Sequence, residues 1–196
     1  MTTDADTTRA DEHRLDDLDS SARAFVEWVV VVVVAIVVAV IVRNFVLAHF
    51  EVDGSSMDTT LTDGDRVFVN RLSYRLHDPN RGDVVVLHQD VANRDLIKRI
   101  IALPGETVEM TNCEVRITEP GGQPRVLDEP YLDLQVISDT CGGDFAPAVV
   151  PDEHVWVMGD NRSGSQDSRA LGPISEDDLI GRAFVVFWPR ADWRWL

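Results

Sequence analysis

A long apolar run near the start of the chain places the strongest limit on how this sequence can fold. From Trp28 to Val42 there are 15 consecutive apolar residues, and Phe25 and Val26 extend the run beyond Glu27. Strands usually have about 5 to 6 residues, and a Val/Ile strand of this length would be prone to aggregate. The run therefore favours a membrane-spanning helix over a buried strand or a core helix.

The length of the run allows a single crossing. The 18 residues from Phe25 to Val42 make a helix of about 27 Å, slightly shorter than the bilayer core of about 30 Å. We expect Arg43 to snorkel and the helix to continue toward Phe50. A cleavable secretory signal is the alternative, because residues 46–48 form a small-x-small-like triplet. The acidic tail, the length of the run and the position of Arg43 before the triplet favour an anchor.

The segment before the run is polar and acidic. The first 24 residues hold seven acids and three arginines, and the whole chain has a net charge of -16. This segment has few large apolar side chains, and burying them cannot offset the conformational entropy lost on folding. We therefore expect residues 1–24 to be a disordered tail. The acidic balance argues against nucleic acid as a partner.

The arginines that flank the run predict its orientation. Three arginines precede the run, whereas only Arg43 follows it closely. Positive residues favour the cytoplasmic side, so we expect the tail to be cytoplasmic. The chain would then pass once through the plasma membrane, with the helix and a juxtamembrane extension in residues 25–50. Residues 51–196 would form one extracytoplasmic domain.

Residues 51–196 have the pattern of a mainly β protein. Short β-branched runs recur between turn signals such as Asp63-Gly64 and Pro104-Gly105, and no βαβ rhythm appears. Residues 119–151 are rich in Gly, Pro and Asp and are expected to be a long excursion; a short helical turn is expected at Ser175. The expected strands are Arg66–Asn70, Asp83–His88, Leu96–Ala102, Thr107–Met110, Glu114–Thr118, His154–Met158 and Arg182–Trp188.

The two cysteines and the histidines carry little chemistry by themselves. Outside the cytoplasm Cys113 and Cys141 could pair across 27 intervening residues, which would contribute about 3 to 4 kcal/mol; two unpaired thiols are the alternative. No spacing suggests a metal or cofactor site. Each histidine is interpreted as structural, because none lies in a Ser-His-Asp motif; they are His13, His49, His77, His88 and His154.

Lys98 is the first residue whose setting suggests catalysis. Strand alternation puts it on the same face as Leu96 and Ile100. Burial of that face would lower the Lys98 pKa and make a neutral, proton-accepting amine accessible near neutral pH. Arg99 cannot take this role, because a guanidinium stays charged. The alternative is an edge-strand lysine that snorkels and discourages strand pairing.

Two polar segments could complete a site around Lys98. Residues 53–61 form a hydroxyl-rich turn after the anchor, which by itself is typical of a solvated turn. Residues 158–172 are dense in hydrogen-bonding groups and follow an apolar strand directly. An ordinary loop held by Asx turns and an Asp-Arg pair would have the same composition.

Taken in order behind an N-terminal anchor, these segments resemble the bacterial type I signal peptidases, Ser-Lys serine proteases of peptidase family S26. The family motif Ser-Met-x-Pro-Thr-Leu matches residues 56–61 except that Thr59 replaces proline. A Lys-Arg pair followed by Leu-Pro-Gly-acid matches residues 98–106, and Gly-Asp-Asn-Arg-x-x-Ser-x-Asp-Ser-Arg matches residues 159–169. Residues 81–85 match a shorter family box.

The resemblance implies a role for each matching residue. Ser56 would be the nucleophile and its backbone N–H an oxyanion donor, with neutral Lys98 as the general base. Gly54 stands where some relatives have a serine as a second donor, which leaves the second donor open. Ser165 would hydrogen-bond and orient Lys98. The supporting residues would be Asp160, Asp167 and Arg169.

The resemblance also implies a fold and a function. The fold would be a signal-peptidase-like β-barrel or coiled β-sheet. The enzyme would remove signal peptides from exported preproteins after small-x-small sites, with the lipid bilayer as its other partner, no cofactor and a monomeric state. One alternative is an inactive membrane-tethered β domain that binds exported chains. The other is a repressor-type self-cleaving Ser-Lys protease, which would carry a DNA-binding module in place of an anchor.

Overall fold

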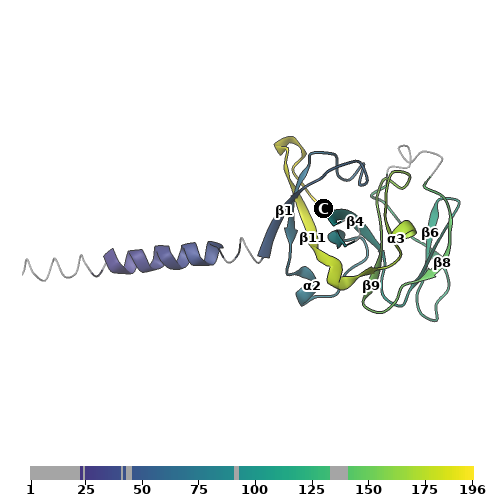
Figure 1. Cartoon of the computed structure of the whole chain (residues 1–196), viewed down its shortest axis with the longest axis horizontal. Helices are drawn as coiled ribbons and strands as arrows, with labels where there is room; N and C mark the ends of the chain where they lie inside the picture. The colour runs from purple at the N-terminus through teal and green to yellow at the C-terminus, as the bar shows by residue number, and fades with distance from the viewer. Residues whose placement is uncertain (1–22, 24, 41, 43–45, 91–92, 133–140) are drawn as a thin grey trace, which may run out of the picture. The chain divides into compact units, whose positions relative to one another are not determined.

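The computed structural model describes residues 23, 25–40, 42, 46–90, 93–132 and 141–196. It divides the chain into two compact units, residues 1–44 and 45–196 (Figure 1). In the first unit residues 25–40 are helical and expose their large apolar side chains. Among the described residues, no helix is both long and apolar enough to span a membrane. The expected tail, apart from Arg23, lies outside the described residues.

The predicted continuation of the helix toward Phe50 is wrong. Residues Leu47–Glu51 form strand β1, which pairs antiparallel with β2 (Arg66–Asn70). Its side chains alternate between exposed and half-buried, and Ala48 and Phe50 pack against the core. This period-two burial is what a sheet edge requires, so residues 47–50 belong to the folded domain.

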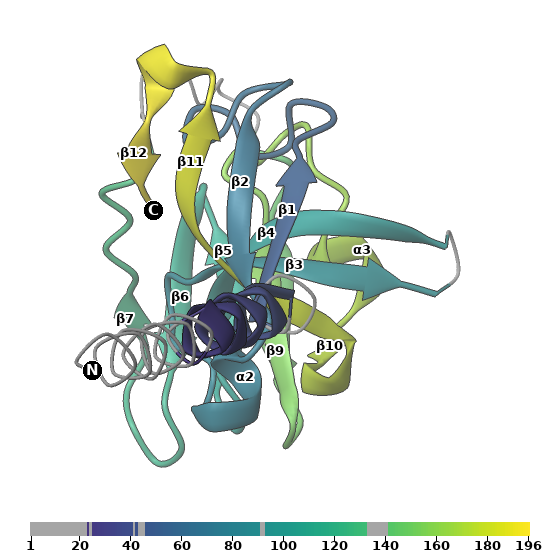
Figure 2. The same cartoon turned by 90° about the vertical axis from the view of Figure 1, so that its left-hand side faces the viewer.

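A mainly β domain is confirmed. The larger sheet has eight strands in the order β1-β2-β11-β3-β4-β9-β10, with β12 paired to β11, and all pairs are antiparallel (Figure 2). This order brings together segments that are far apart in the sequence. The strands not yet given are β3 (Val84–Gln89), β4 (Arg94–Ala102), β9 (His154–Met158), β10 (Ile174–Ser175), β11 (Leu179–Trp188) and β12 (Arg194–Trp195).

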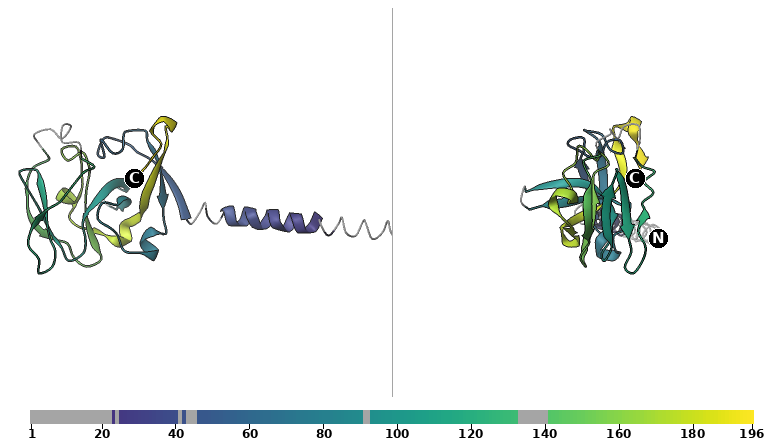
Figure 3. Two further views of the ribbon diagram at one scale, coloured as in Figure 1. Left: turned by 180° about the vertical axis from the view of Figure 1, so that it is seen from behind. Right: turned by 90° about the vertical axis from the view of Figure 1, so that its right-hand side faces the viewer.

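A second, four-stranded sheet lies at the end of the domain away from β1 (Figure 3). Its order is β7-β6-β5-β8, and the segment expected as an excursion supplies β7 and β8. Cys113, in the turn between β5 and β6, forms the predicted disulfide with Cys141. The strands are β5 (Thr107–Thr111), β6 (Glu114–Thr118), β7 (Arg125–Val126) and β8 (Phe145–Val149).

The helical segments of the domain are short. They are α2 (Ser73–Leu76), α3 (Ser168–Leu171) and the 3₁₀ turns η2 (Glu176–Asp178) and η3 (Arg190–Asp192). The turn predicted at Ser175 is confirmed as η2, with the Ser175 hydroxyl accepting from the Asp177 amide at 3.3 Å. Helices this short depend on the sheets around them.

Two buried clusters of the core position the polar loops. One lies under β2 and β11 and includes Met57 and Leu61 from the turn after β1. The other joins the small sheet to β4 and β9 through Ile101 and Met158. Each fully buried aliphatic side chain contributes about 1.5 to 3 kcal/mol, so the polar segments are attached at both ends to a stable framework.

Candidate active site

The structure brings Lys98 and Ser56 together. Lys98 lies on β4, and Ser56 lies in the turn after β1, 42 residues earlier. The Lys98 Nζ is 2.7 Å from the Ser56 Oγ and also donates to the Ile97 carbonyl at 2.9 Å. The serine and lysine singled out by the sequence are therefore within hydrogen-bond distance of each other.

Burial sets the protonation of Lys98. The residue is 2% exposed, and loss of hydration disfavours its ammonium form. The Lys98 pKa falls from 10.5 to about 8, although the carboxylates of Asp167 and Asp160 act in the opposite direction. Roughly a tenth of the molecules then carry a neutral amine at pH 7. Such an amine can accept the proton of a hydroxyl 2.7 Å away.

The turn that carries Ser56 is fixed from two sides. The buried side chains of Met57 and Leu61 anchor it to the core, and the Leu61 amide donates to the Met57 carbonyl at 2.8 Å. Asn161 donates its amide to the Ser56 carbonyl at 3.1 Å and its Nδ2 to the Ser55 carbonyl at 3.0 Å. Within the described part of the chain the Ser56 amide has no acceptor. It is available to an oxyanion.

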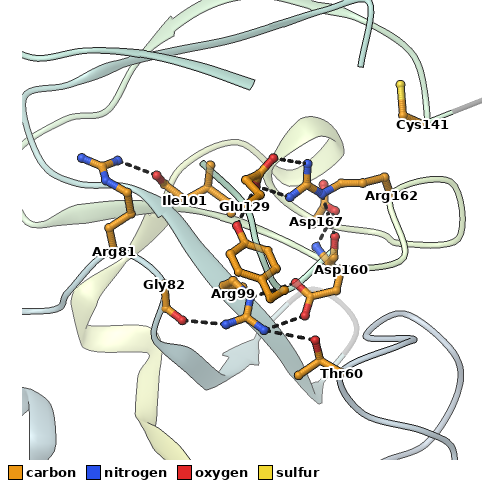
Figure 4. Close-up of polar contacts among 12 residues, drawn as sticks. Thr60, Arg81, Gly82, Arg99, Ile101, Glu129, Cys141, Asp160, Arg162 and Asp167 are labelled. Atoms are coloured by element: carbon orange, nitrogen blue, oxygen red, sulfur yellow. Dashed lines mark hydrogen bonds and ion pairs between the residues drawn. The ribbon is translucent and has the colours of Figure 1, made fainter. Parts of the chain in front are cut away.

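Arg99 joins three segments beneath the site (Figure 4). It binds Asp160 through two hydrogen bonds, Nε to Oδ1 at 2.9 Å and Nη2 to Oδ2 at 2.7 Å, and both side chains are buried. It also donates to the Gly82 carbonyl at 2.8 Å and to the Thr60 hydroxyl at 3.2 Å. Removal of one partner from such a buried pair costs about 3 to 5 kcal/mol. Asp160 therefore holds the loop after β9 against β4.

Asp167 organises the same loop from within. Its carboxylate accepts from the Gly159 amide at 3.0 Å and from Arg169 Nε and Nη2, each at 2.8 Å. Burial alone would raise the Asp167 pKa, but the donors of Arg169 and Gly159 outweigh it and lower the pKa. Arg169 also donates to the Cys141 carbonyl at 3.0 Å. The expected Asp-Arg pair is thus part of a buried network, which an ordinary solvated loop would lack.

Ser165 does not form the expected hydrogen bond with Lys98. Its hydroxyl is buried and makes no regular hydrogen bond to the residues that the structure describes, but it lies near enough to Asp167 to help lower the pKa of that carboxyl. It packs on Gly159, where an added Cβ would lie 2.3 Å from the Ser165 Oγ and 2.4 Å from the Ser56 carbonyl oxygen. Because Gly159 has no side chain, the Ser165 hydroxyl and the Ser56 carbonyl can both lie against its backbone. An orienting role for Ser165 stays a prediction.

Sequence reasoning missed a layer supplied by residues 128–132, which we name the strap; in it Glu129, Tyr131 and Leu132 are half-buried, whereas Asp128 and Pro130 are exposed. The Arg99 guanidinium lies over the Tyr131 ring, 3.8 Å from Cζ to the ring centroid. The Tyr131 hydroxyl donates to Glu129 at 2.6 Å. Burial and the nearby Glu129 carboxylate raise the Tyr131 pKa, so the phenol stays protonated. The strap therefore covers the face of Arg99 that its hydrogen bonds leave open.

The strap is also joined to the loop after β9. Glu129 pairs with Arg162 at 3.1 Å and 2.5 Å (Figure 4), and Arg162 donates to the Gly159 carbonyl at 3.1 Å. Asn161 and Arg162 lie in the family motif at residues 159–169. That motif was the sequence signal that could have identified both residues. The strap lies in a segment without periodicity, and no local signal pointed to it.

A pocket of about 100 Å³ opens beside Ser56 and Lys98. This volume is below the roughly 300 to 1,000 Å³ of pockets that hold drug-sized ligands. In the described ranges no group of three His, Cys, Asp or Glu side chains could hold a metal ion. The lining of the pocket is half apolar and half polar or charged: Phe50, Val52, Val86, Leu96 and Ile97 on one side of this division, and Glu51, Asp53, Ser56, Asp95 and Lys98 on the other.

A serine hydroxyl in contact with a desolvated lysine, beside a small pocket on a β scaffold, is the arrangement of a serine hydrolase. Comparison with known proteins gives the family. The family described as "Signal peptidase, peptidase S26" matches residues 25–188. The chain therefore belongs to the signal peptidase S26 family, and it is a serine endopeptidase.

Individual relatives agree with this assignment. Signal peptidase I S of Bacillus subtilis is 40% identical over 182 residues, covering 89% of this chain and 95% of that protein. Signal peptidase IB of Staphylococcus aureus is 34% identical over 186 residues, covering 88% and 94%. A signal peptidase I crystal structure from Enterococcus faecalis has 28% identity and a TM-score of 0.47, covering 54% of this chain and 97% of that chain. The family inferred from the three motifs is confirmed.

Proposed function

We propose that this chain is a signal peptidase I that removes signal peptides from exported preproteins after small-x-small sites. Ser56 is the nucleophile and neutral Lys98 the general base. The observation that carries the proposal is the 2.7 Å contact between the two groups, with a lysine that is 2% exposed. Relatives named signal peptidase I, at 34% to 40% identity, support the substrate class.

Acylation follows from this geometry. The Ser56 Oγ attacks the scissile carbonyl carbon while its proton passes to the neutral Lys98 Nζ. The carbonyl oxygen becomes an oxyanion, which the Ser56 amide stabilises as a preorganised donor. Lys98, now an ammonium, protonates the leaving amine as the C–N bond breaks. The signal peptide remains as an ester on Ser56.

Deacylation reverses these proton transfers. A water molecule gives one proton to neutral Lys98 as its oxygen attacks the ester carbonyl. When the tetrahedral intermediate collapses, the Ser56 oxygen leaves and recovers a proton from Lys98. The signal peptide departs as a carboxylic acid, and the amine is neutral again for the next cycle.

The pocket supports a preference for small side chains at the cut. It holds about 100 Å³ beside Ser56, and five apolar side chains form part of its walls. A larger substrate side chain would have to displace residues of the walls, which are packed from β1 and β4. A small residue before the scissile bond fits without such a cost.

We infer that the apolar segment 25–42 anchors the enzyme in the plasma membrane, with residues 1–24 in the cytoplasm and the β domain outside. The exposed apolar side chains along residues 25–40 support an apolar environment for this helix. An anchor would keep a monomeric enzyme and its membrane-bound substrate in one plane and so raise their effective concentration.

The test uses the full chain purified in detergent with a preprotein that has a small-x-small site. We expect the wild type to cut at that site and Ser56→Ala and Lys98→Ala to be inactive. Ser163→Ala is the matched control, because the Ser163 hydroxyl is exposed and donates only to Asn161. Cutting by Lys98→Ala at the wild-type rate would refute the role of Lys98 as the general base. Absence of cutting by every form, the wild type included, would favour a binding domain instead.

A further inference from the structure

The turn that carries Ser56 is bound at Thr60 by two arginines, one from strand β4 and one from strand β12. Arg99 donates to the Thr60 hydroxyl at 3.2 Å, as described above. Arg194, directly before Trp195-Leu196, donates its Nη2 to the Thr60 carbonyl at 2.5 Å. Thr60 lies between the buried anchors Met57 and Leu61. The hydroxyl and the carbonyl of Thr60 are thus both held in place.

The C-terminal hairpin presents Arg194 to the turn. Strand β12 pairs with β11 through Arg194 and Trp195, and η3 forms the bend between the two strands. The Arg194 Nη1 donates back to the Asp192 carbonyl at 2.8 Å, which limits the movement of the side chain. Leu196 packs against the same core cluster as Met57. The hairpin and the turn therefore share one core.

Asp65 is the ionic partner of Arg194. Its carboxylate is 1% exposed, accepts from the Thr62 amide at 3.0 Å and lies 3.0 Å from Arg194 Nη2. Its Oδ1 has no partner in the described part of the chain. Loss of Arg194 would leave this carboxylate buried and unpaired, which by itself destabilises the fold. An informative test must separate this effect on stability from an effect on Ser56.

We propose that Arg194 is a positioning residue for the nucleophile: its bond to the Thr60 carbonyl fixes the turn that holds the Ser56 hydroxyl against Lys98. The proposal rests on the proposed function of Ser56 and Lys98. Displacement of a reacting group by about 1 Å can cost about 100-fold in rate. A contact four residues from the nucleophile, on a turn this short, can set its position on that scale.

The experiment compares three variants of the full chain in detergent. Arg194→Ala removes the contact, and Arg194→Lys keeps a donor for the Thr60 carbonyl. The double variant Asp65→Asn/Arg194→Ala also removes the buried charge while keeping an acceptor for the Thr62 amide. Arg116→Ala is the matched control, because Arg116 makes an ion pair with Glu114 at 3.1 Å on the small sheet, away from Ser56.

We expect Arg194→Ala to lower kcat for a small-x-small preprotein by roughly 10- to 100-fold with little change in KM. Arg194→Lys should recover most of the rate, and the double variant should regain thermal stability without regaining kcat. Arg116→Ala should leave kcat unchanged. The proposal is overturned if the double variant recovers kcat together with Tm, or if Arg194→Ala cuts as fast as the wild type.

A second readout does not need turnover. Lys98 is the only lysine in the sequence, so ¹³Cε labelling of lysine gives one NMR signal whose titration reports the amine directly. We expect its midpoint to rise in Arg194→Ala, because withdrawal of the Ser56 hydroxyl lets water reach the amine. If the wild type does not cut a preprotein, the proposed function fails, and this signal alone decides the role of Arg194. An unchanged titration midpoint of Lys98 then overturns the proposed role of Arg194.

Discussion

Lys98 carries a desolvation cost that the proposed role as general base would explain. It is 2% exposed, and its nearest polar partners, the Ser56 hydroxyl and the Ile97 carbonyl, are both uncharged. A structural lysine would snorkel to water or take a carboxylate partner. A buried amine of lowered pKa is instead what a base needs to be neutral near physiological pH.

This setting predicts how cleavage depends on pH. The Lys98 pKa is about 8, and only the neutral amine accepts the serine proton. We therefore expect kcat/KM to rise about tenfold per pH unit below pH 8 and to level off above it. The same midpoint should appear in the NMR titration of the single lysine in the free enzyme. A midpoint near the ordinary value of 10.5 would show that the amine is hydrated and contradict its role as the base.

Gly159 gives a second prediction at the residue scale. A Cβ at this position would lie 2.3 Å from the Ser165 Oγ and 2.4 Å from the Ser56 carbonyl oxygen. We expect Gly159→Ala to push the nucleophile turn outward, lowering stability by about 1 to 3 kcal/mol and kcat/KM by at least roughly 100-fold. Thermal unfolding and peptide cleavage measure the two effects.

Gly122→Ala is the matched control for this change. Gly122 lies in the turn between β6 and β7, outside the loop that carries Gly159, and the nearest atom to its added Cβ would be the Glu119 carbonyl oxygen at 3.1 Å. The control should retain most of the activity. Similar losses of cleavage in both variants would mean that the effect at Gly159 does not come from its contact with the Ser56 turn.

At the scale of elements, local patterns predicted the strands and failed where distant segments meet. Arg66–Asn70, Glu114–Thr118 and His154–Met158 have the expected bounds, because alternation and turn residues determine them locally. The helix was expected to continue toward Phe50 because residues 25–42 alone make a helix slightly shorter than the bilayer core. Pairing with β2 decides that segment, and the partner begins at Arg66.

The candidate site shows the same division. The motifs gave Ser56, Lys98 and the acidic residues, because these lie in short contiguous segments. The strap could not be predicted, because Tyr131 and Glu129 act through Arg99 and Arg162, more than 30 residues away in the chain. Arg194 likewise meets its partner 134 residues away. Such contacts exist only after the fold has formed.

The strap provides a prediction at this scale. Tyr131→Leu removes the ring beneath the buried Arg99 guanidinium, 3.8 Å from its centroid, and should destabilise the domain by about 2 kcal/mol. Because Arg99 holds Asp160 and Thr60, we also expect a lower kcat. Tyr131→Phe is the control, since it keeps the ring and removes only the hydroxyl bond to Glu129. If both variants lose equal stability in urea unfolding, the hydroxyl and not the ring is the important group.

At the scale of the whole domain, the Ser56–Lys98 pair and the disulfide lie on different sheets. Ser56 and Lys98 are held by the larger sheet, whereas Cys113 lies in the turn between β5 and β6 of the smaller one. The Cys141 carbonyl accepts from Arg169, and a Cβ on Gly142 would lie 2.3 Å from the Arg162 carbonyl. The disulfide therefore fastens the small sheet to the segment after β9 that carries Arg162 and Arg169, and not to Ser56 or Lys98.

Removal of this disulfide should therefore reduce stability far more than chemistry. The bond closes a separation of 28 residues, so the double variant Cys113→Ser/Cys141→Ser should lose about 3 to 4 kcal/mol of unfolding free energy. Well below its Tm it should still cut a preprotein within a few-fold of the wild-type rate, with an unchanged Lys98 midpoint. Denaturant unfolding, cleavage and the lysine signal measure these three quantities. Loss of cleavage while the domain remains folded would mean that the small sheet positions Ser56 and Lys98 directly.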